Sequence, residues 1–269
     1  MTELRPLPGG RVRYDVMGAA ESPPGDLLES GWSNLGFPLW WFEWDDPWEN
    51  RDAPPLRSAC VSHSILGGTL PSAEELLERA VGLWPSIDAG ATVDRIAKAV
   101  APFGEIVHVA SLLPRSLPRL RLTLRVQAAE LTGLLAAVDW PGDTASVREA
   151  LELFATPATK IGVQLEVDDR VLPYLGLESR EFRSRATVQR HGPKLERALA
   201  RLAPLPERLL QSLLTWPQRT DEGVCHSYAK LTLDGREWSS KVYLGVTKPR
   251  VAQRMRAAHP QLWTFSLAP

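Results

Sequence analysis

The sequence has few of the features that mark exported, membrane-spanning or disulfide-stabilised proteins. It contains two cysteines, Cys60 and Cys225, which are too few for a disulfide framework. Residues 1–13 hold no apolar segment of the kind found in a secretion signal. No stretch approaches the roughly 20 apolar residues that cross a bilayer. We therefore expect a cytoplasmic protein that does not associate with a membrane.

The chain also lacks a strong charge of either sign. Its 31 Lys and Arg residues balance 32 Asp and Glu residues, which leaves a formal net charge of -1. The molecule as a whole is therefore not an electrostatic nucleic-acid binder, and any site for an anion must arise from local clustering of basic residues.

Metal-ligand spacing and phosphate-binding loops are missing from the sequence as well. His63, His108 and His226 fall on three different predicted strands, without the close spacing of zinc ligands. The pair Gly67-Gly68 follows a predicted strand and does not open a helix, as the glycines of a phosphate loop would. We expect no metal site and no bound cofactor.

What the sequence does have is a regular alternation of basic and aliphatic residues along predicted strands. The clearest run is Arg119-Leu120-Arg121-Leu122-Thr123-Leu124-Arg125-Val126-Gln127. Residues 226–232 and 241–243 form similar runs, with tyrosines and lysines in the polar positions. Because successive side chains of a strand point to opposite faces, one face is aliphatic and must be buried, whereas the other is basic and phenolic.

The order of predicted elements indicates a repeated unit of two strands followed by two helices. Hydrophobic residues make up 44% of the 269 residues, enough for one large domain with a full core. Residues 1–38, rich in Pro and Gly, are predicted to be an irregular N-terminal segment with one short strand at 11–16, and residues 39–269 a single domain. The predicted strands cover 39–46, 56–66, 105–112, 119–127, 160–167, 170–182, 224–233 and 238–246. The predicted helices cover 71–84, 92–101, 128–138, 144–154, 193–202, 206–215 and 248–258.

This rhythm predicts an α+β fold built as an antiparallel β-barrel of 8–10 strands with an outer ring of helices. Short hairpins make neighbouring strands antiparallel, and Asp234-Gly235 favours a type I′ turn in the last hairpin. Eight or more twisted strands tend to close because closure removes exposed edges. The alternative is an open antiparallel sheet with helices on one face and water on the other.

If the sheet closes, its polar face becomes a lumen that suits a diphosphate. The alternation assigns to this lumen the cations Arg121, Arg125, Lys160, Lys230 and Lys241, the tyrosines Tyr228 and Tyr243, and the acids Glu43, Asp45, Glu166 and Glu178. Arg and Lys side chains bind phosphate oxygens, and fixed cations favour departure of a diphosphate. Tyrosine rings shield a carbocation from water.

The same residues resemble those of a known enzyme family. Lys241-Val242-Tyr243 and the inward-facing pair Arg121 and Arg125, set in the strand-strand-helix-helix rhythm, are similar to aromatic prenyltransferases of the ABBA, or PT-barrel, family, which includes indole prenyltransferases. The resemblance covers residues 39–247 as a pattern. It implies that Lys-x-Tyr steps hold a prenyl diphosphate, and Tyr228-Ala229-Lys230 has the same members in reverse order. Five strand pairs are typical of the family, whereas four clear pairs are predicted here.

The resemblance implies a metal-independent transfer of a prenyl group from an allylic diphosphate to an electron-rich aromatic, such as indole or tryptophan, free or in a peptide. Glu43 matches the acidic residue that accepts the indole N–H in the indole branch, and Trp41 would line the substrate entrance. His226 is a second candidate proton acceptor. A looser similarity of residues 41–45 and 230–245 to bacterial proteins encoded near peptide-modification genes points to natural-product biosynthesis.

Simpler interpretations of the same residues remain open. The lysines and tyrosines could form a solvated strand face, the arginines could pair with Glu166, and His226 could be a satisfied buried histidine. A non-catalytic barrel that binds a peptide or partner enzyme in a biosynthetic cluster is the competing function. In that case Lys241→Ala leaves function intact, whereas Trp41→Ala abolishes partner binding.

Overall fold

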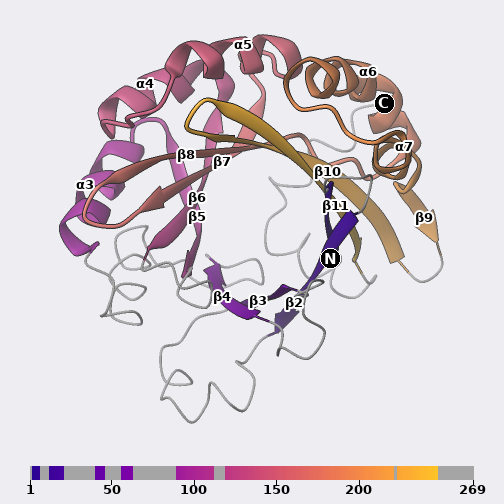
Figure 1. Ribbon diagram of the computed structural model, residues 1–269, viewed down its shortest axis with the longest axis horizontal. Helices are drawn as coiled ribbons and strands as arrows, with labels where there is room; N and C mark the ends of the chain where they lie inside the picture. The colour runs from indigo at the N-terminus through magenta and orange to yellow at the C-terminus, as the bar shows by residue number, and fades with distance from the viewer. Residues whose placement is uncertain are drawn as a thin grey trace.

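The computed structural model describes residues 2–6, 12–20, 40–45, 56–62, 89–111, 119–220 and 223–247 (Figure 1). The strands are β1 Thr2–Pro6, β2 Val12–Ala20, β3 Trp40–Asp45, β4 Leu56–Ser62, β5 Gly104–Ser111, β6 Leu120–Gln127, β7 Lys160–Val167, β8 Val171–Glu178, β9 Gln218–Thr220, β10 Gly223–Asp234 and β11 Glu237–Thr247. The helices are α3 Gly90–Val100, the 3₁₀ turn η4 Ala128–Glu130, α4 Leu131–Ala137, α5 Thr144–Phe154, α6 Arg185–Leu202 and α7 Glu207–Thr215. The predicted helices at 71–84 and 248–258 lie outside the described residues.

Six long strands form the antiparallel sheet that carries the described side chains. Their order is β5-β6-β7-β8-β10-β11. The helices lie against one face of this sheet, so that the chain folds into a layer of strands covered by an arch of helices (Figure 1). The predicted mixture of helices with an antiparallel sheet is confirmed.

The four N-terminal strands continue the same hydrogen-bonded ladder. β1 pairs with both β11 and β2, β2 with β3, β3 with β4, and β4 with β5. Since β11 also pairs with β10, the pairings of ten strands run in a cycle, to which β9 adds as a further strand on β10. The five antiparallel pairs β1–β2, β3–β4, β5–β6, β7–β8 and β10–β11 include one more clear pair than the sequence predicted.

Within residues 1–38, which the sequence predicts to be irregular apart from one short strand at 11–16, the structure has two strands. Residues 2–6 and 12–20 are extended and hydrogen-bonded, and the second strand is longer than the short piece expected at 11–16. β1 takes its partners from β2 and from β11 at the other end of the chain, through Thr2↔Leu244 and Leu4↔Val242. A pairing across that sequence distance leaves no local signal in a segment rich in Pro and Gly.

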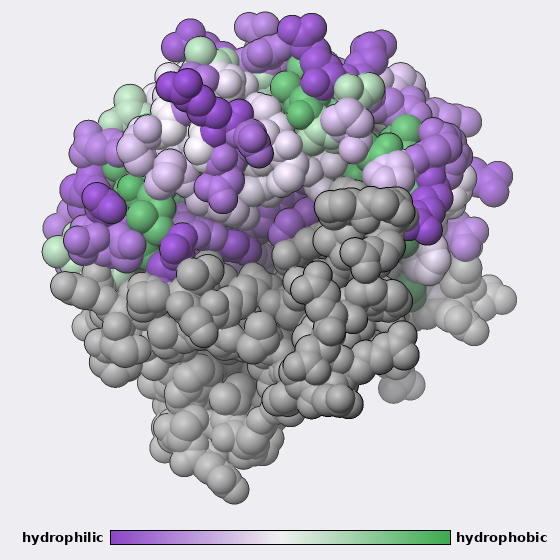
Figure 2. All heavy atoms as spheres, viewed as in Figure 1, coloured by the Kyte–Doolittle hydropathy of each residue, from purple (hydrophilic) through white to green (hydrophobic). Residues whose placement is uncertain are grey.

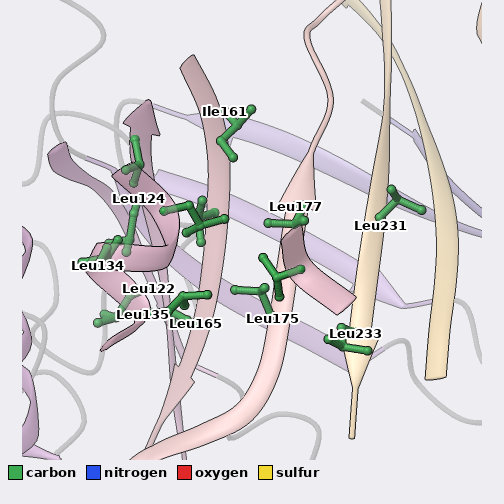
Figure 3. Packing of buried hydrophobic residues seen from close by; sticks show 14 of the residues in the cluster. Leu122, Leu124, Leu134, Leu135, Ile161, Leu165, Leu175, Leu177, Leu231 and Leu233 are labelled. Carbon is green, nitrogen blue, oxygen red and sulfur yellow. The ribbon is translucent and has the colours of Figure 1, made fainter. Parts of the chain in front are cut away.

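The aliphatic positions of the alternating strands make the core under the helices. Leu120, Leu122, Leu124 and Val126 of β6 are at most 1% exposed. They pack with the corresponding residues of the neighbouring strands and with helix residues such as Leu134 (Figure 3). The predicted buried aliphatic face is therefore confirmed. On the face seen in Figure 2, the described outer surface is mostly hydrophilic, with scattered apolar residues.

Side-chain caps mark the starts of α5 and α6. The Asp143 side chain accepts a hydrogen bond from the Ala145 N–H at 2.9 Å and so caps the N-terminus of α5. α6 begins at Arg185, because Ser184 caps it, and Pro193 lies inside the helix instead of at its start. A proline costs the helix one N–H donor, and the buried inner face of α6 offsets this cost.

The turn of the last hairpin also differs from the prediction. Asp234 pairs with Glu237, so the turn residues are Gly235 and Arg236 and not Asp234-Gly235. Gly235 has a φ of 65°, whereas Arg236 is not among the described residues with positive φ. This pattern fits a type II′ turn, which needs positive φ at its first central residue alone, and not the predicted type I′ turn.

We expect Leu122→Ala to lower the free energy of unfolding by about 2–5 kcal/mol, because it opens a cavity in a fully packed region. Val246→Ala is the control, since Val246 is 52% exposed, and it should cost less than about 0.5 kcal/mol. Urea unfolding of both variants measures the difference. Equal costs would contradict the assignment of the β6 aliphatic face to the core.

Candidate functional site

The sheet face turned away from the helices carries the polar residues of the alternating strands. In β10 these residues include His226, Tyr228 and Lys230, and the antiparallel register fixes their neighbours on β11. His226 lies opposite Gly245, Tyr228 opposite Tyr243, and Lys230 opposite Lys241. We call this surface of β5–β8, β10 and β11 the polar face.

The centre of the polar face is shielded from solvent. Lys230 is 1% exposed, His226 is 7% exposed and Glu166 is 4% exposed, although none of them lies under the helices. If water covered this face of the sheet, these side chains would be exposed to solvent. The side chains at these positions are therefore not part of a solvated strand face, and burial of the charges demands partners for them.

Glu166 of β7 holds two arginines of the neighbouring strand region. Its Oε2 accepts from Arg119 Nη1 at 2.9 Å, and its Oε1 accepts from Arg121 Nη2 at 2.5 Å. The Arg121 guanidinium carbon also lies 4.7 Å from the centre of the Tyr174 ring, within cation–π range. The pairing of Arg121 with Glu166 is the one that the simpler interpretation of the sequence predicts.

Lys230 lies at the centre of a second network. Its ammonium donates to Gln164 Oε1, and Gln164 Nε2 donates to Glu178 Oε1 at 2.8 Å. The Lys230 nitrogen is 5.8 Å from the centre of the Tyr174 ring, so Tyr174 lies near both networks. Burial raises the pKa of the Glu178 carboxyl, although the charges of Lys230 and Arg125 and the Gln164 hydrogen bond act in the opposite direction.

Two glycines make room for the charged side chains of this network. A Cβ atom on Gly176 would lie 2.8 Å from Lys230 Cε, and a Cβ atom on Gly162 would overlap the Glu178 carboxylate. Each glycine is the cross-strand neighbour of a longer side chain on the polar face. The missing side chains therefore allow Lys230 and Glu178 to lie flat across adjacent strands.

The tyrosines of the predicted site form a stacked pair. The rings of Tyr228 and Tyr243 are 4.5 Å apart between centres and 3° from parallel. Their residues are directly opposite in the β10–β11 ladder. The pair lies on the polar face, with Tyr228 two residues before Lys230 on the same strand.

His226 is held by an acidic residue that the sequence analysis did not select. Its Nδ1 lies against Glu181 Oε1, and Arg183 Nε donates to Glu181 Oε2 at 2.5 Å. Burial alone would raise the pKa of Glu181, but the His226 hydrogen bond and the Arg183 charge hold it at about 2. Gly245 contributes space here as well, because a Cβ atom on it would lie 2.5 Å from His226 Cε1 and Nε2.

The structure brings most of the predicted side chains onto one face. His226, Lys230 and Tyr243 are buried there, and Arg121, Arg125, Tyr228 and Lys241 are partly buried. Lys160 is exposed at the start of β7, opposite Gln127, and so lies at the end of the face.

Two predicted residues lie on β3, where the structure describes backbone pairing and no side chains. Glu43 is opposite Met17 and Ser58, and Trp41 is opposite Ala19 and Cys60. Their assigned roles therefore stay predictions.

Three residues of the polar face were missed in the sequence. Tyr174 has the same strand parity as Glu178, so the alternation along β8 was a signal that could have identified it. Glu181 and Arg183 follow the end of β8, and an isolated bridge between Phe182 and Ser227 brings them to β10. That bridge is a tertiary contact, and no local pattern indicates it.

In the part of the chain that the structure describes, no three His, Cys, Asp or Glu side chains converge in a way that could hold a metal ion. Within the same residues, no helix combines the length and apolar character required to traverse a bilayer.

Two solved structures are similar to this chain along most of its length. One is a structure named 6-dimethylallyl tryptophan synthase, at 16% identity and a TM-score of 0.50, with 92% of this chain and 82% of that chain covered. The other is 6-dimethylallyltryptophan synthase from Micromonospora olivasterospora in complex with DMASPP and Trp, at 15% identity and a TM-score of 0.49, with 92% and 83% covered. The first likeness shows a shared fold. No family model matches the chain, and no curated protein matches it.

We expect Gly245→Ala to lower the free energy of unfolding by about 1–3 kcal/mol, because the added methyl group must displace the His226 ring. In a His226→Ala background the same substitution should cost much less, because the obstructing ring is gone. Urea unfolding of the two single variants and the double variant measures the coupling. Purely additive costs would mean that the methyl group does not meet the ring.

Glu181 should make the stability of the protein sensitive to acid. Its pKa is about 2 in the folded chain against a usual value of 4.5, so its contribution is complete above pH 4.5 and is lost as the pH falls toward 2. The stability difference between the wild type and Glu181→Gln should therefore shrink over that range in urea unfolding. Glu149→Gln, which alters an exposed pair with Arg201, is the control. A difference that stays constant with pH would contradict the pairing.

Proposed function

We propose that this chain is an aromatic prenyltransferase of the ABBA type. It would transfer a prenyl group from an allylic diphosphate to an electron-rich aromatic, with the indole of free or peptide-bound tryptophan as the acceptor. The observation that carries the proposal is the buried basic and phenolic face, found on a fold shared with a 6-dimethylallyl tryptophan synthase. The other similar structure has DMASPP and Trp bound.

The cyclic strand pairing supports a barrel in which the polar face is turned inward. Ten strands pair in a ring, and the helices lie on the aliphatic side of the six strands with described side chains. A ring of this kind leaves the polar face as its inner wall. Burial of Lys230 and His226 on that face is consistent with an enclosed reaction space.

The diphosphate would lie among the cations at the centre of the polar face. Lys230 and Lys241 are direct neighbours across β10 and β11, so both ammonium groups could contact one diphosphate. Arg121 and Arg125 of β6 extend the basic surface on the other side of the Lys230 network. Of the predicted cations, the exposed Lys160 has the weakest structural support.

The residues of the polar face suit each step of the transfer. The allylic C–O bond breaks and its electron pair leaves with the diphosphate, whose charge the fixed cations stabilise without a metal. The stacked Tyr228 and Tyr243 rings shield the allylic cation. A π-electron pair of the acceptor ring forms the new C–C bond. Glu43 would orient the acceptor N–H, and Glu43 or His226 would accept the proton released when the ring regains aromaticity.

The internal pairing of the cations favours the competing function. Glu166 pairs with both Arg119 and Arg121, and the Lys230 ammonium donates to Gln164, which in turn donates to Glu178, so these three cations already have partners within the protein. A non-catalytic barrel that binds a peptide or a partner enzyme would have the same contacts. The genes next to the coding sequence separate the two proposals, since a prenyl-diphosphate synthase or a precursor peptide supports a role in bacterial natural-product biosynthesis.

We expect Lys230→Ala and Lys241→Ala each to weaken DMASPP binding at least about tenfold, because each removes a charge that would contact the diphosphate. Lys98→Ala, which removes an exposed lysine of α3, should leave binding unchanged. Isothermal titration calorimetry measures DMASPP affinity. Mass spectrometry detects turnover of dimethylallyl and geranyl diphosphate with tryptophan and tryptophan-containing peptides. A wild type that neither binds DMASPP nor yields prenylated product would rule out the enzyme.

A further inference from the structure

The contact between His226 and Glu181 places a carboxylate against one nitrogen of a buried imidazole. Nδ1 of the buried imidazole lies against a carboxylate oxygen, and the other oxygen of that carboxylate accepts from Arg183 Nε. A carboxylate at one ring nitrogen favours the proton on that nitrogen and leaves the other nitrogen as the acceptor. The Phe182–Ser227 bridge ties the segment of Glu181 and Arg183 to β10 next to His226.

The surroundings of His226 fix the plane and the position of its ring. The Cε1 and Nε2 edge occupies the space of a missing side chain at Gly245. Tyr228 follows His226 by two residues on the same face of β10, a spacing of about 7 Å along a strand. The ring is therefore close to the stacked tyrosines that would face the reacting carbon.

We infer that Glu181 is a positioning residue that holds the His226 imidazole with its proton on Nδ1, so that Nε2 is the base that takes the ring proton of the acceptor. This inference rests on the proposed function. In the step, the C–H bond of the alkylated ring carbon breaks, its electron pair restores the aromatic ring, and the proton moves to the Nε2 lone pair. The imidazolium that forms is stabilised by the ionised Glu181.

Two features support an ionised Glu181 beside His226. The pKa of Glu181, about 2, keeps the carboxylate charged throughout the neutral range. Arg183 balances part of the charge of Glu181. Glu178 is a second acidic group that interacts electrostatically with Glu181. Removal of the charge while the shape is kept should therefore change the imidazole more than it changes the fold.

The decisive variant is Glu181→Gln. Arg183 can only donate, so the Gln amide oxygen should turn toward Arg183 and its NH₂ group toward His226 Nδ1. Nδ1 must then accept, which moves the ring proton to Nε2. We expect ¹⁵N NMR of histidine-labelled protein to show Nδ1 protonated in the wild type and Nε2 protonated in Glu181→Gln. The His226 signals are identified among the five histidines of the chain by their loss in His226→Gln.

The kinetic expectation is a loss in kcat with little change in KM. Glu181→Gln should lower kcat at least about 100-fold and leave KM for dimethylallyl diphosphate and tryptophan within about threefold, since binding groups are untouched. With ring-deuterated tryptophan, the variant should show an isotope effect on kcat larger than that of the wild type. Glu149→Gln, an exposed Glu–Arg pair on the helices, should match the wild type in both measurements.

These measurements distinguish failure of the Glu181 positioning role from failure of the proposed prenyl transfer. The positioning role is overturned if the wild type already carries the proton on Nε2, or if the tautomer in Glu181→Gln is unchanged. The role of Nε2 as the base is overturned if the tautomer inverts and kcat stays the same. Tautomer inversion in a protein that turns over no diphosphate would support the positioning contact and overturn the prenyl transfer.

Discussion

Burial of Lys230 on the sheet face opposite the helices is the constraint on which the rest of the polar face depends. An ammonium that is 1% exposed needs polar partners, because an isolated buried charge costs several kcal/mol. The ammonium donates to Gln164, Gln164 in turn donates to Glu178, and the aromatic ring of Tyr174 lies nearby. These partners come from β7 and β8, so the charge on β10 links three neighbouring strands.

The same constraint explains the glycines of the polar face. Strand glycines are costly because they lose conformational freedom and offer no side chain for packing. Gly162 and Gly176 lie where Glu178 and Lys230 cross the sheet, and Gly245 lies where His226 does. Each glycine is thus part of a charged contact. A methyl group at any of these positions would displace the side chain that crosses it.

The sequence predicted the two faces of the sheet better than it predicted the connections between strands. Alternation identified Leu122, Leu124 and Leu231 as core and Lys230 and Tyr243 as polar-face residues, because a one-residue shift would put every leucine of a strand in the wrong environment. Contacts between distant segments gave no such signal. The formation of β1 depends on its pairing with β11, and the position of Glu181 depends on the Phe182–Ser227 bridge. The turn at Gly235 and the start of α6 were misjudged because single residues, Asp234 and Pro193, outweighed register and capping.

Internal pairing of the cations is compatible with binding of an anion. A guanidinium carries five N–H donors and an ammonium three, so one carboxylate contact does not use the whole capacity of either group. Glu166 fixes the direction of Arg121, and Gln164 fixes that of Lys230. Side chains held in this way lose little conformational entropy when a ligand arrives, whereas flexible lysines would lose more. Glu166 and Gln164 would therefore also orient these cations for the proposed diphosphate, at the expense of some of the attraction that unpaired charges would have.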